Sequence, residues 1–345
     1  MSGSGDADRF ATACVATPHY LASHAGAAVL RGGGNAMDAA IAANLVLGVV
    51  APYTCGIGGD CFAIVWDGAL HGYNGSGRAP GAATPDAVAG CVDPGASEVP
   101  GMPRSGPLPI TVPGAVDAWF ALLERFGTRS FAELAEPAIA YAADGFPLTA
   151  AGAARIGAGE PVEPRWGEWQ DIYGKAQAGA RLSQPGLALT LQTVAAGGPD
   201  AFYRGVIGAA VAAHVRELGG LLDAADLAIH EGEWVEPLEG RYRDVTVAEL
   251  PPNSQGSAAL LALHLLDHAG PLPADGPERQ HVLIEAVAAA LAERDAHLTD
   301  PARMRIPPET LADPAHAEAI AATGSSPVAG AARGGGGDTA YLCAV

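Results

Sequence analysis

The sequence predicts an α+β fold, because long segments with helical spacing alternate with short β-prone segments. Hydrophobic residues make up 49% of the 345-residue chain and charged residues 17%, a balance typical of a folded globular protein. Residues 36–50 are apolar on nearly every helical face, whereas residues 61–75 contain two β-prone runs separated by Asp67-Gly68, a strong hairpin signal. The 46 glycines and 27 prolines predict many turns between short elements. The length fits one large domain or two ordinary ones, and no internal repeat is visible.

A strand followed by two helices is predicted near the N-terminus. Residues 13–17 form an apolar, β-prone run, and residues 19–30 follow helical spacing as far as the glycine stop at 32–34. Asn35 is placed to cap the next helix, residues 36–50. Because that helix is apolar all round, we expect it to lie buried between two layers.

The middle of the chain is predicted to be mainly helical. Residues 84–109 are rich in proline, glycine and alanine without periodicity and fit a surface loop. Helical spacing then recurs at residues 112–125, 131–144, 187–196 and 203–218. These segments predict a helical layer.

The C-terminal third mixes one alternating segment with further helices. Residues 241–250 alternate polar and apolar side chains, which predicts a strand, and a proline-rich turn follows at 251–256. Helices are expected at residues 258–266 and 281–297. Low-complexity residues 321–338 predict a flexible glycine-rich linker that leads into a strand-like segment, 339–345.

Charge and cysteine content exclude several classes of function. The balance of 19 basic against 38 acidic residues gives a net charge of −19, which disfavours nucleic acid and anionic membranes as partners. The longest apolar stretch, residues 36–51, is too short to span a bilayer. The five cysteines show no paired C-x-x-C spacing, so neither a zinc site nor a complete disulfide framework is indicated. With no signal-like start, we expect a cytoplasmic protein.

Polar residues in helical segments have structural explanations. Asp38 and Asn44 interrupt the apolar helix, and helix-to-loop hydrogen bonds are favoured over a catalytic role, because buried polar groups need partners. The run 293–295 (Glu-Arg-Asp) favours an ion-pair cluster. His19, His24 and His281 have no histidine partner at metal-binding spacing, so no metal is expected.

Residues 56–59 (GIGG) could be mistaken for part of a nucleotide-binding loop. A dinucleotide fingerprint requires a strand, G-x-G-x-x-G and then a helix, but here the glycines follow a helix and precede a strand. A tight turn beside the active-site layer is the preferred interpretation, because glycine permits close backbone approach.

The junction Asp338-Thr339 joins the glycine-rich linker to an apolar strand-like segment. A threonine hydroxyl is a weak nucleophile unless a nearby base accepts its proton, and the threonine's own α-amine, released by cleavage of the preceding peptide bond, can be that base. By itself the Gly-Asp-Thr pattern is weak evidence, and a plain boundary between a loop and a strand is the favoured interpretation of it.

Many segments in the same order resemble those of γ-glutamyltransferases. They include the glycine-rich region after the first helices, the V-P-G helix start, the P-P-N-S-Q-G turn and the final G-D-T junction. The matching segments are 15–68, 110–128, 133–149, 198–205, 219–228, 233–256, 281–301 and 337–345. No single motif is decisive, but so many in one order indicate this family.

The resemblance implies an αββα N-terminal nucleophile hydrolase sandwich, here incomplete at the C-terminus. Residues 1–338 would be the large-subunit region and residues 339–345 the start of the small subunit. Autocleavage between Asp338 and Thr339 would make Thr339 the catalytic nucleophile, which transfers a γ-glutamyl group from a small molecule such as glutathione to water or an amino acid. No metal or organic cofactor is implied. The oxyanion donors would come from the small-subunit segment that this chain lacks.

The expected substrate-binding segment departs from the family pattern D-G-R-E-T-A-P, whose arginine binds the α-carboxylate of the glutamyl group. Residues 74–80 read N-G-S-G-R-A-P. Aligned on the last two residues, Ser76 occupies the place of the arginine and Arg78 follows two residues later. A displaced carboxylate clamp is therefore expected, with an exposed turn residue as the alternative reading of Arg78.

Two other functions remain open. A truncated, catalytically inactive fragment, or a subunit that needs a separate partner chain, is consistent with the few residues after Thr339. The altered segment around Arg78 also leaves room for a glutaryl-type amide acylase with little transpeptidation.

Overall fold

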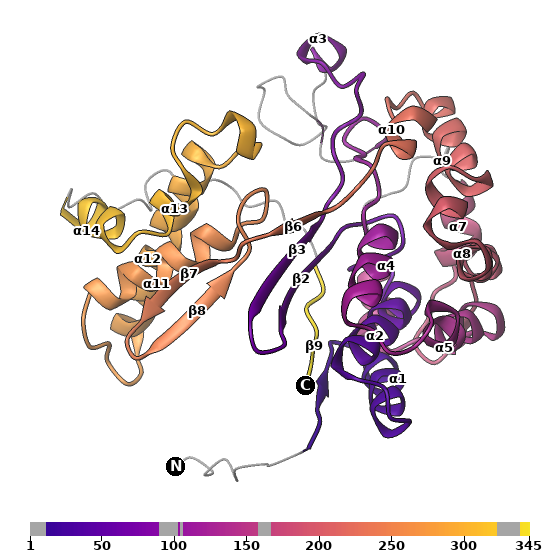
Figure 1. The fold of residues 1–345 in the computed structure, drawn as a ribbon, viewed down its shortest axis with the longest axis horizontal. Coiled ribbons are helices and arrows are strands. Elements are labelled where there is room, and N and C mark those ends of the chain that lie inside the picture. The colour runs from indigo at the N-terminus through magenta and orange to yellow at the C-terminus, as the bar shows by residue number, and fades with distance from the viewer. Residues whose placement is uncertain (1–11, 90–102, 104–105, 158–166, 323–338) are drawn as a thin grey trace. The chain divides into compact units, whose positions relative to one another are not determined.

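The computed structural model describes residues 12–89, 103, 106–157, 167–322 and 339–345. The chain divides into two compact units (Figure 1). Unit 1 comprises Met1–Cys61, Gly75–Gly232 and Gly337–Val345, and unit 2 comprises Phe62–Asn74 and Glu233–Gly336. Helices and strands occur in both units, which confirms the predicted α+β class.

Unit 1 is mainly helical. Its helices are α1 (Tyr20–Arg31), α2 (Ala36–Val50), α3 (Pro85–Val88), α4 (Ala115–Phe126), α5 (Phe131–Asp144), α6 (Ala150–Gly157), α7 (Gly167–Tyr173), α8 (Pro185–Tyr203), α9 (Val206–Glu217) and α10 (Ala224–Ala228). Its short strands are β1 (Val15–Ala16), β4 (Phe146–Pro147), β5 (Arg181–Leu182) and β9 (Cys343–Ala344).

Helix α2 is the core helix of unit 1, as its composition predicts. It contacts α1, α4 and α5, and Ile41, Leu45, Val46, Leu47 and Val49 are at most 3% exposed. It also packs tightly on α1, where a Cβ atom on Gly26 would lie 2.9 Å from the Ala39 carbonyl oxygen. A helix buried on every face has no need of a polar side, which explains the uninterrupted apolar run.

Strand β9 pairs with β1, so the two ends of the described chain meet in unit 1 (Figure 1). The strands are antiparallel, with Val15 opposite Ala344 and Ala16 opposite Cys343. Cys14 and Val345 extend the ladder by exchanging two backbone hydrogen bonds of 2.9 Å. A second antiparallel pair joins β4 to β5.

Unit 2 contains a three-stranded sheet of order β2-β3-β6, a β7–β8 hairpin and a group of helices. The strands are β2 (Cys61–Trp66), β3 (Leu70–Gly75), β6 (Glu233–Val235), β7 (Leu238–Tyr242) and β8 (Val245–Glu249). The helices are α11 (Gly256–His268), α12 (Pro277–His297), the short 3-10 helix η2 (Pro301–Arg303), α13 (Pro308–Leu311) and α14 (Pro314–Ala322). Helix α11 contacts both strands of the hairpin and also α12 and α14.

Three predicted elements differ from the structure. The segment predicted as one strand at 241–250 is two strands with a turn between them, because Arg243 adopts a positive φ of 57°. The helix predicted from Tyr203 begins instead at Val206, after extended backbone at Gly205. The strand predicted at 339–345 forms a ladder only at Cys343–Ala344, opposite the short β1.

The predicted surface loop at 84–109 contains the short helix α3, and residues 90–102 and 104–105 of that prediction lie outside the described residues. The predicted linker, residues 321–338, also falls largely outside them, since 323–338 are not described.

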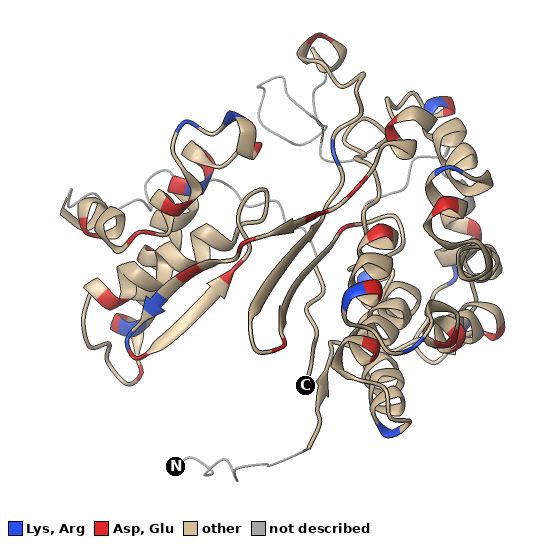
Figure 2. Cartoon of the chain, viewed as in Figure 1, with Lys and Arg blue, Asp and Glu red and all other residues tan. Residues whose placement is uncertain are grey.

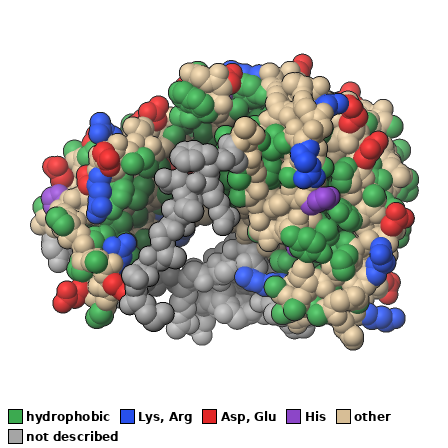
Figure 3. Space-filling model, turned by 90° about the horizontal axis from the view of Figure 1, so that it is seen from below, with side chains coloured by type: hydrophobic (Ala, Val, Ile, Leu, Met, Phe, Trp, Pro, Cys, Tyr) green, Lys and Arg blue, Asp and Glu red, His purple; other side chains and the backbone are tan. Residues whose placement is uncertain are grey.

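Acidic residues are distributed over the helices and strands of both units, with fewer Lys and Arg residues among them (Figure 2). On the face drawn in Figure 3, basic side chains are scattered between hydrophobic and acidic ones. None of the helices in the described part of the chain has the length and apolar character needed to span a bilayer.

Candidate functional site

The candidate site lies in unit 1, where five chain segments distant in sequence are tied together. The first is the turn at residues 56–60, closed by a hydrogen bond of 3.0 Å from Gly59 N to the Gly56 carbonyl. The Gly59 carbonyl in turn accepts hydrogen bonds from the backbone N–H groups of Gly114 (3.0 Å) and Ala115 (2.9 Å), at the start of α4. The predicted tight turn is confirmed, and its role is to hold the first turn of α4.

The segment that carries Arg78 crosses the segment before α4 at backbone contact. A Cβ atom on Gly77 would lie 1.5 Å from the Val112 carbonyl oxygen, and one on Gly114 would lie 2.2 Å from the Gly75 carbonyl oxygen. The Val112 N–H also donates to the Arg78 carbonyl at 3.0 Å. No side chain fits at this crossing, so glycine is required there for spatial reasons.

Asp60 fixes the same segment from the other side. One of its carboxylate oxygens accepts a hydrogen bond of 3.3 Å from the backbone N–H of Gly77. Desolvation raises the pKa of the Asp60 carboxyl, while the Gly77 N–H and the nearby His230 act in the opposite direction. The backbone is therefore held at Gly77 by Asp60 and at Arg78 by Val112.

Tyr203 connects the start of α4 with the segment after α10. Its buried hydroxyl donates to the Pro113 carbonyl at 2.8 Å and accepts from the Asp117 N–H at 3.1 Å. The Asp117 carboxylate accepts from the Gly232 N–H at 2.9 Å. Burial raises the pKa of Tyr203 well above its ordinary value, so the hydroxyl stays protonated and acts as a structural donor.

His230 completes the cluster. Its ring packs against the Tyr203 ring with 5.0 Å between centroids, and the side chain is 9% exposed. Burial lowers the pKa of His230, the carboxylates of Asp117 and Asp60 raise it, and Arg78 lowers it again. The imidazole is thus neutral near neutral pH.

Of the predicted substrate-binding residues, Arg78 is exposed and Ser76 is half-buried. The backbone of the Arg78 segment is fixed at Gly77 and at the Arg78 carbonyl. An exposed guanidinium on a fixed backbone can bind a carboxylate with little loss of conformational freedom. Whether Arg78 and Ser76 touch substrate stays a prediction.

The predicted nucleophile Thr339 also belongs to unit 1. Its side chain is exposed and precedes β9 in the chain, and exposure alternates from Thr339 to Val345 as in a strand with one free face. The other half of the predicted cleavage site, Asp338, lies outside the described residues. The catalytic role of Thr339 therefore stays a prediction.

The cysteines near the site are poor candidates for a nucleophile. Burial raises the pKa of the Cys61 thiol to about 12, and the charges of Asp60 and Cys55 add to this. Burial also raises the pKa of Cys55. Because the thiolate is the reactive form, both thiols are unreactive at neutral pH.

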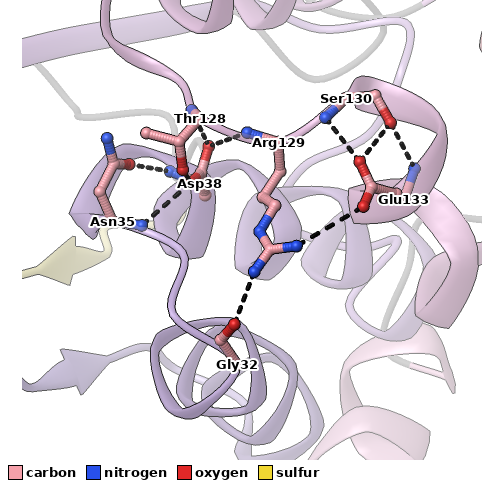
Figure 4. Close-up of polar contacts among 7 residues, drawn as sticks. All are labelled: Gly32, Asn35, Asp38, Thr128, Arg129, Ser130 and Glu133. Atoms are coloured by element: carbon pink, nitrogen blue, oxygen red, sulfur yellow. Dashed lines mark hydrogen bonds and ion pairs between the residues drawn. The ribbon is translucent and has the colours of Figure 1, made fainter.

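A second polar cluster in unit 1 is structural (Figure 4). The fully buried Asp38 accepts hydrogen bonds from the backbone N–H groups of Asn35 (2.9 Å), Thr128 (2.8 Å) and Arg129 (3.1 Å), and from the Thr128 hydroxyl (2.5 Å). The predicted helix-to-loop partners of Asp38 are confirmed. The other polar residue singled out in α2, Asn44, instead accepts from the indole N–H of Trp119 in α4 at 2.8 Å.

Other polar residues singled out from the sequence also have structural partners. His19 caps α1 by accepting from the Leu21 N–H at 3.3 Å. Arg294 pairs with Asp295 at 2.6 Å, and Glu293 pairs with His316 at 2.8 Å, which confirms the predicted ion-pair cluster. Within the described residues, no group of three or more His, Cys, Asp or Glu side chains could hold a metal ion.

Sequence reasoning missed four members of the candidate site: Asp60, Asp117, Tyr203 and His230. Each is an isolated polar or aromatic residue with no local pattern around it. The one available signal is that Asp60 and His230 stand beside glycine-rich or turn-forming residues, where functional side chains often occur.

Comparison with known proteins gives a family match over most of the chain. The family model described as Gamma-glutamyltranspeptidase matches residues 22–343. The chain is 38% identical over 341 residues to the "Glutathione hydrolase-like YwrD proenzyme" of Bacillus subtilis (strain 168), an alignment that covers 96% of this chain and 64% of that protein. It is 36% identical over 316 residues to the "Acylase ACY 1 proenzyme" of Pseudomonas sp. (strain SE83), an alignment that covers 88% of this chain and 57% of that protein. The chain thus spans 64% and 57% of the length of these curated relatives.

Solved structures share the fold. A cephalosporin acylase from Bacillus halodurans superimposes with a TM-score of 0.83 at 33% identity, covering 100% of this chain and 66% of that one. A γ-glutamyltranspeptidase from Pseudomonas nitroreducens, complexed with L-DON, gives a TM-score of 0.79 at 28% identity, covering 90% and 93%. These similarities confirm the predicted fold class, that of the N-terminal nucleophile hydrolases.

Proposed function

Because this chain belongs to the γ-glutamyltranspeptidase family, we propose that it supplies the acyl-donor site and the nucleophile of an enzyme that transfers γ-glutamyl groups to water or to an amino acid. The observation that carries the proposal is the family match itself, which continues to residue 343 and so includes Thr339. That residue is exposed and precedes a strand, as a nucleophile released by chain cleavage requires.

The proposed maturation step uses only groups of the chain and one water molecule. The Thr339 hydroxyl attacks the Asp338 carbonyl carbon, and the acyl group moves from the Thr339 nitrogen to its side-chain oxygen. Water then hydrolyses this ester, leaving a carboxylate on Asp338 and a free α-amine on Thr339.

In the mature protein this α-amine accepts the hydroxyl proton as Thr339 attacks the side-chain amide of the donor. The C–N bond of the amide breaks, the amine product leaves with a proton, and the acyl group stays on Thr339 as an ester. Water or an amino-acid amine then attacks the ester and regenerates the hydroxyl. Arg78 would bind the donor's carboxylate and set the distance to the reacting amide.

Mass spectrometry of the protein translated from its own complete coding sequence tests the nucleophile. We expect a new amino terminus at Thr339, absent in Thr339→Ala and still formed, more slowly, in Thr339→Ser. A protein that remains in one piece and still hydrolyses γ-glutamyl-p-nitroanilide would show that the mechanism is wrong.

Steady-state kinetics test the carboxylate clamp. Arg78→Ala should raise KM for γ-glutamyl-p-nitroanilide by about 10-fold to 100-fold with a smaller change in kcat, because a charge-assisted pair to the donor is lost before chemistry begins. Arg204→Ala is the matched control, since Arg204 is an exposed arginine that pairs with Asp200. An unchanged KM in Arg78→Ala would leave Arg78 as an exposed turn residue.

A second candidate function is that of a glutaryl-type amide acylase with little transpeptidation. Two observations favour it: the departure of residues 74–80 from the family pattern, and the similarity to a relative named as an acylase. Glutaryl-p-nitroanilide lacks the α-amine of the γ-glutamyl compound. An acylase should show a higher kcat/KM for glutaryl-p-nitroanilide than for γ-glutamyl-p-nitroanilide. Its rate should also be independent of an added acceptor dipeptide.

The remaining proposals concern partners and location. We propose that the active protein includes the small-subunit segment that follows Thr339 and that it works in the cytoplasm. The rival, an inactive fragment, is tested by assaying the 345-residue chain beside the product of the complete coding sequence. Equal rates of hydrolysis would contradict both the rival and the proposal that the active protein needs residues beyond Val345.

A further inference from the structure

His230 is a buried histidine that the proposed chemistry does not use. Its side chain is 9% exposed, and the Nε2 atom has no hydrogen-bond partner. Buried polar groups are normally paired, and the exceptions call for an explanation. The position of His230 beside the Arg78 segment suggests one.

The imidazole is held firmly in place by its neighbours. The His230 backbone N–H donates to the Leu227 carbonyl at the end of α10, at 3.1 Å, and the Gly232 N–H is bound by Asp117 at 2.9 Å. The ring lies tilted against Tyr203, with 34° between the planes.

Charged groups of both signs act on the pKa of His230. Asp117 at the start of α4 and Asp60 in the glycine-rich turn favour the imidazolium, whereas burial and the Arg78 guanidinium oppose it. Burial is the largest effect, and it keeps the pKa of His230 below its usual value. Tyr203, the ring packed against it, remains uncharged. A change in charge at Arg78 therefore acts directly on this balance.

We propose that His230 makes the site selective for anionic acyl donors, by taking up a proton when a carboxylate binds at Arg78. The inference rests on the proposed function, since it takes Arg78 as the group that binds the donor's carboxylate. A bound carboxylate brings a negative charge that offsets the positive charge of Arg78, and this change favours the imidazolium. Solvent supplies the proton, which adds to the imidazole ring, and no covalent bond between heavy atoms is made or broken.

The coupling works in both directions. If the carboxylate promotes protonation, then protonation must strengthen carboxylate binding by the same factor. Between about pH 8 and about pH 6, the affinity for an anionic ligand should rise by about twofold to threefold. The full tenfold that corresponds to a shift of about one pKa unit is reached only at a pH below the pKa of His230 in the free protein. An uncharged ligand of the same shape should show no such rise, so discrimination against neutral acyl groups increases as the pH falls.

Isothermal titration calorimetry on the mature, complete protein tests this inference. The probe is 5-oxohexanoate, which resembles a glutaryl amide, is not hydrolysed and has one carboxylate that is ionised over this pH range. Titration at about pH 7 in two buffers with different ionisation enthalpies measures the protons taken up on binding. The uncharged amide of the same acid is the ligand control.

We expect wild-type protein to take up a fraction of a proton with 5-oxohexanoate and His230→Gln to take up none. The matched control is His264→Gln, because His264 is also buried without hydrogen-bond partners but lies in unit 2, where Asp267 and Asp313 act on it. Uptake should persist in that control. If His230→Gln does not fold, the NMR pKa of His230 in the wild-type protein gives the same answer, and it should be higher in the presence of 5-oxohexanoate.

Binding without proton uptake, or uptake that persists in His230→Gln, would overturn the inference. Absence of binding would overturn it as well. The proposed function is judged separately, by the new amino terminus at Thr339 and by hydrolysis of γ-glutamyl-p-nitroanilide, so its failure can be told apart from a failure of the coupling.

Discussion

Asp38 shows how one buried carboxylate joins two helix starts. It completes the capping box of α2 with Asn35 and also binds the chain just before α5, through Thr128 and Arg129. Burial alone would raise the pKa of Asp38, but the hydrogen bonds from Thr128, Asn35 and Arg129 outweigh it, and the pKa is lowered. A fully paired carboxylate is therefore a stabilising group even at zero exposure.

Asp38→Asn should lower the free energy of unfolding by about 3 kcal/mol, because an amide nitrogen replaces one acceptor and faces hydrogen-bond donors. Glu133→Gln is the matched control. Glu133 occupies the same capping-box position at the start of α5, but its side chain is 56% exposed, so a much smaller loss is expected. Denaturant unfolding measures the loss in each variant. Equal losses would show that the burial of Asp38 does not increase its contribution to stability.

Between elements, the decisive feature of the site is the crossing of the Arg78 segment over the segment before α4. Backbone meets backbone at Gly77 and Gly114. This close approach lets the Gly77 N–H donate to Asp60 and the Val112 N–H donate to the Arg78 carbonyl. The two backbones can lie this close because neither glycine has a side chain. Protein interiors are close-packed, so even one added methyl group would force the neighbouring atoms to move.

Gly77→Ala should destabilise the protein by about 3 kcal/mol or more, since its Cβ atom would overlap the Val112 carbonyl and the backbone would have to move. It should also raise KM for the donor, through displacement of Arg78. Gly58→Ala is the control from the neighbouring turn, because a Cβ atom there meets nothing within 4 Å. Thermal unfolding and steady-state kinetics compare the two variants. If both lose similar stability and show a similar KM, the close backbone contact at Gly77 is not the cause of the effect.

The contact of β7 with α11 predicts a pH dependence in unit 2. A Cβ atom on Gly240 would lie 2.9 Å from His264 Nε2, so the hairpin packs directly on this buried ring. Burial lowers the pKa of His264, against the opposing effects of Asp267 and Asp313. The unfolded chain therefore binds the proton more readily, and stability falls as the pH drops from the ordinary value of 6.5 through the lower folded value.

His264→Leu should lessen this acid sensitivity. The melting temperature of the variant is expected to fall less than that of the wild type between about pH 8 and about pH 5. His71→Leu serves as the control, since His71 is paired with Asp67 near the surface. A wild-type slope retained in His264→Leu would show that other groups cause the acid loss.

At the scale of the whole molecule, the pairing of β1 with β9 joins the start of the described chain to the residues that follow Thr339. The ladder is short, but β9 also contacts α2, the most buried helix of unit 1. A cut before Thr339 would leave β9 attached to unit 1 without a covalent bond. The fragment that begins at Thr339 should therefore remain bound after cleavage.

Size-exclusion chromatography of the cleaved protein tests this retention. The two pieces should elute together under native conditions and separate only in denaturant. Leu342→Asp should weaken the association, because Leu342 is half-buried, whereas Tyr341→Asp should not, because Tyr341 is 81% exposed. Separation of the wild-type pieces without denaturant would contradict the prediction.

Local patterns determined a large part of this protein. The apolar run of α2, its Asn35 cap and the Asp67-Gly68 hairpin were predicted from neighbouring residues alone, because caps, turns and periodic burial depend on interactions within a few positions. The Thr339 junction was identified from the order of family-like segments, which is also a property of the sequence.

Only the tertiary structure decided the surroundings of Arg78. Asp60, Tyr203 and His230 come from segments far apart in the chain, and no local pattern marks them as neighbours. The same holds for the pairing of β9 with β1 and for the turn at Arg243 that divides the predicted strand. The physical reason is that hydrogen bonds, ring packing and electrostatic effects depend on distance in space, which packing of the whole chain sets.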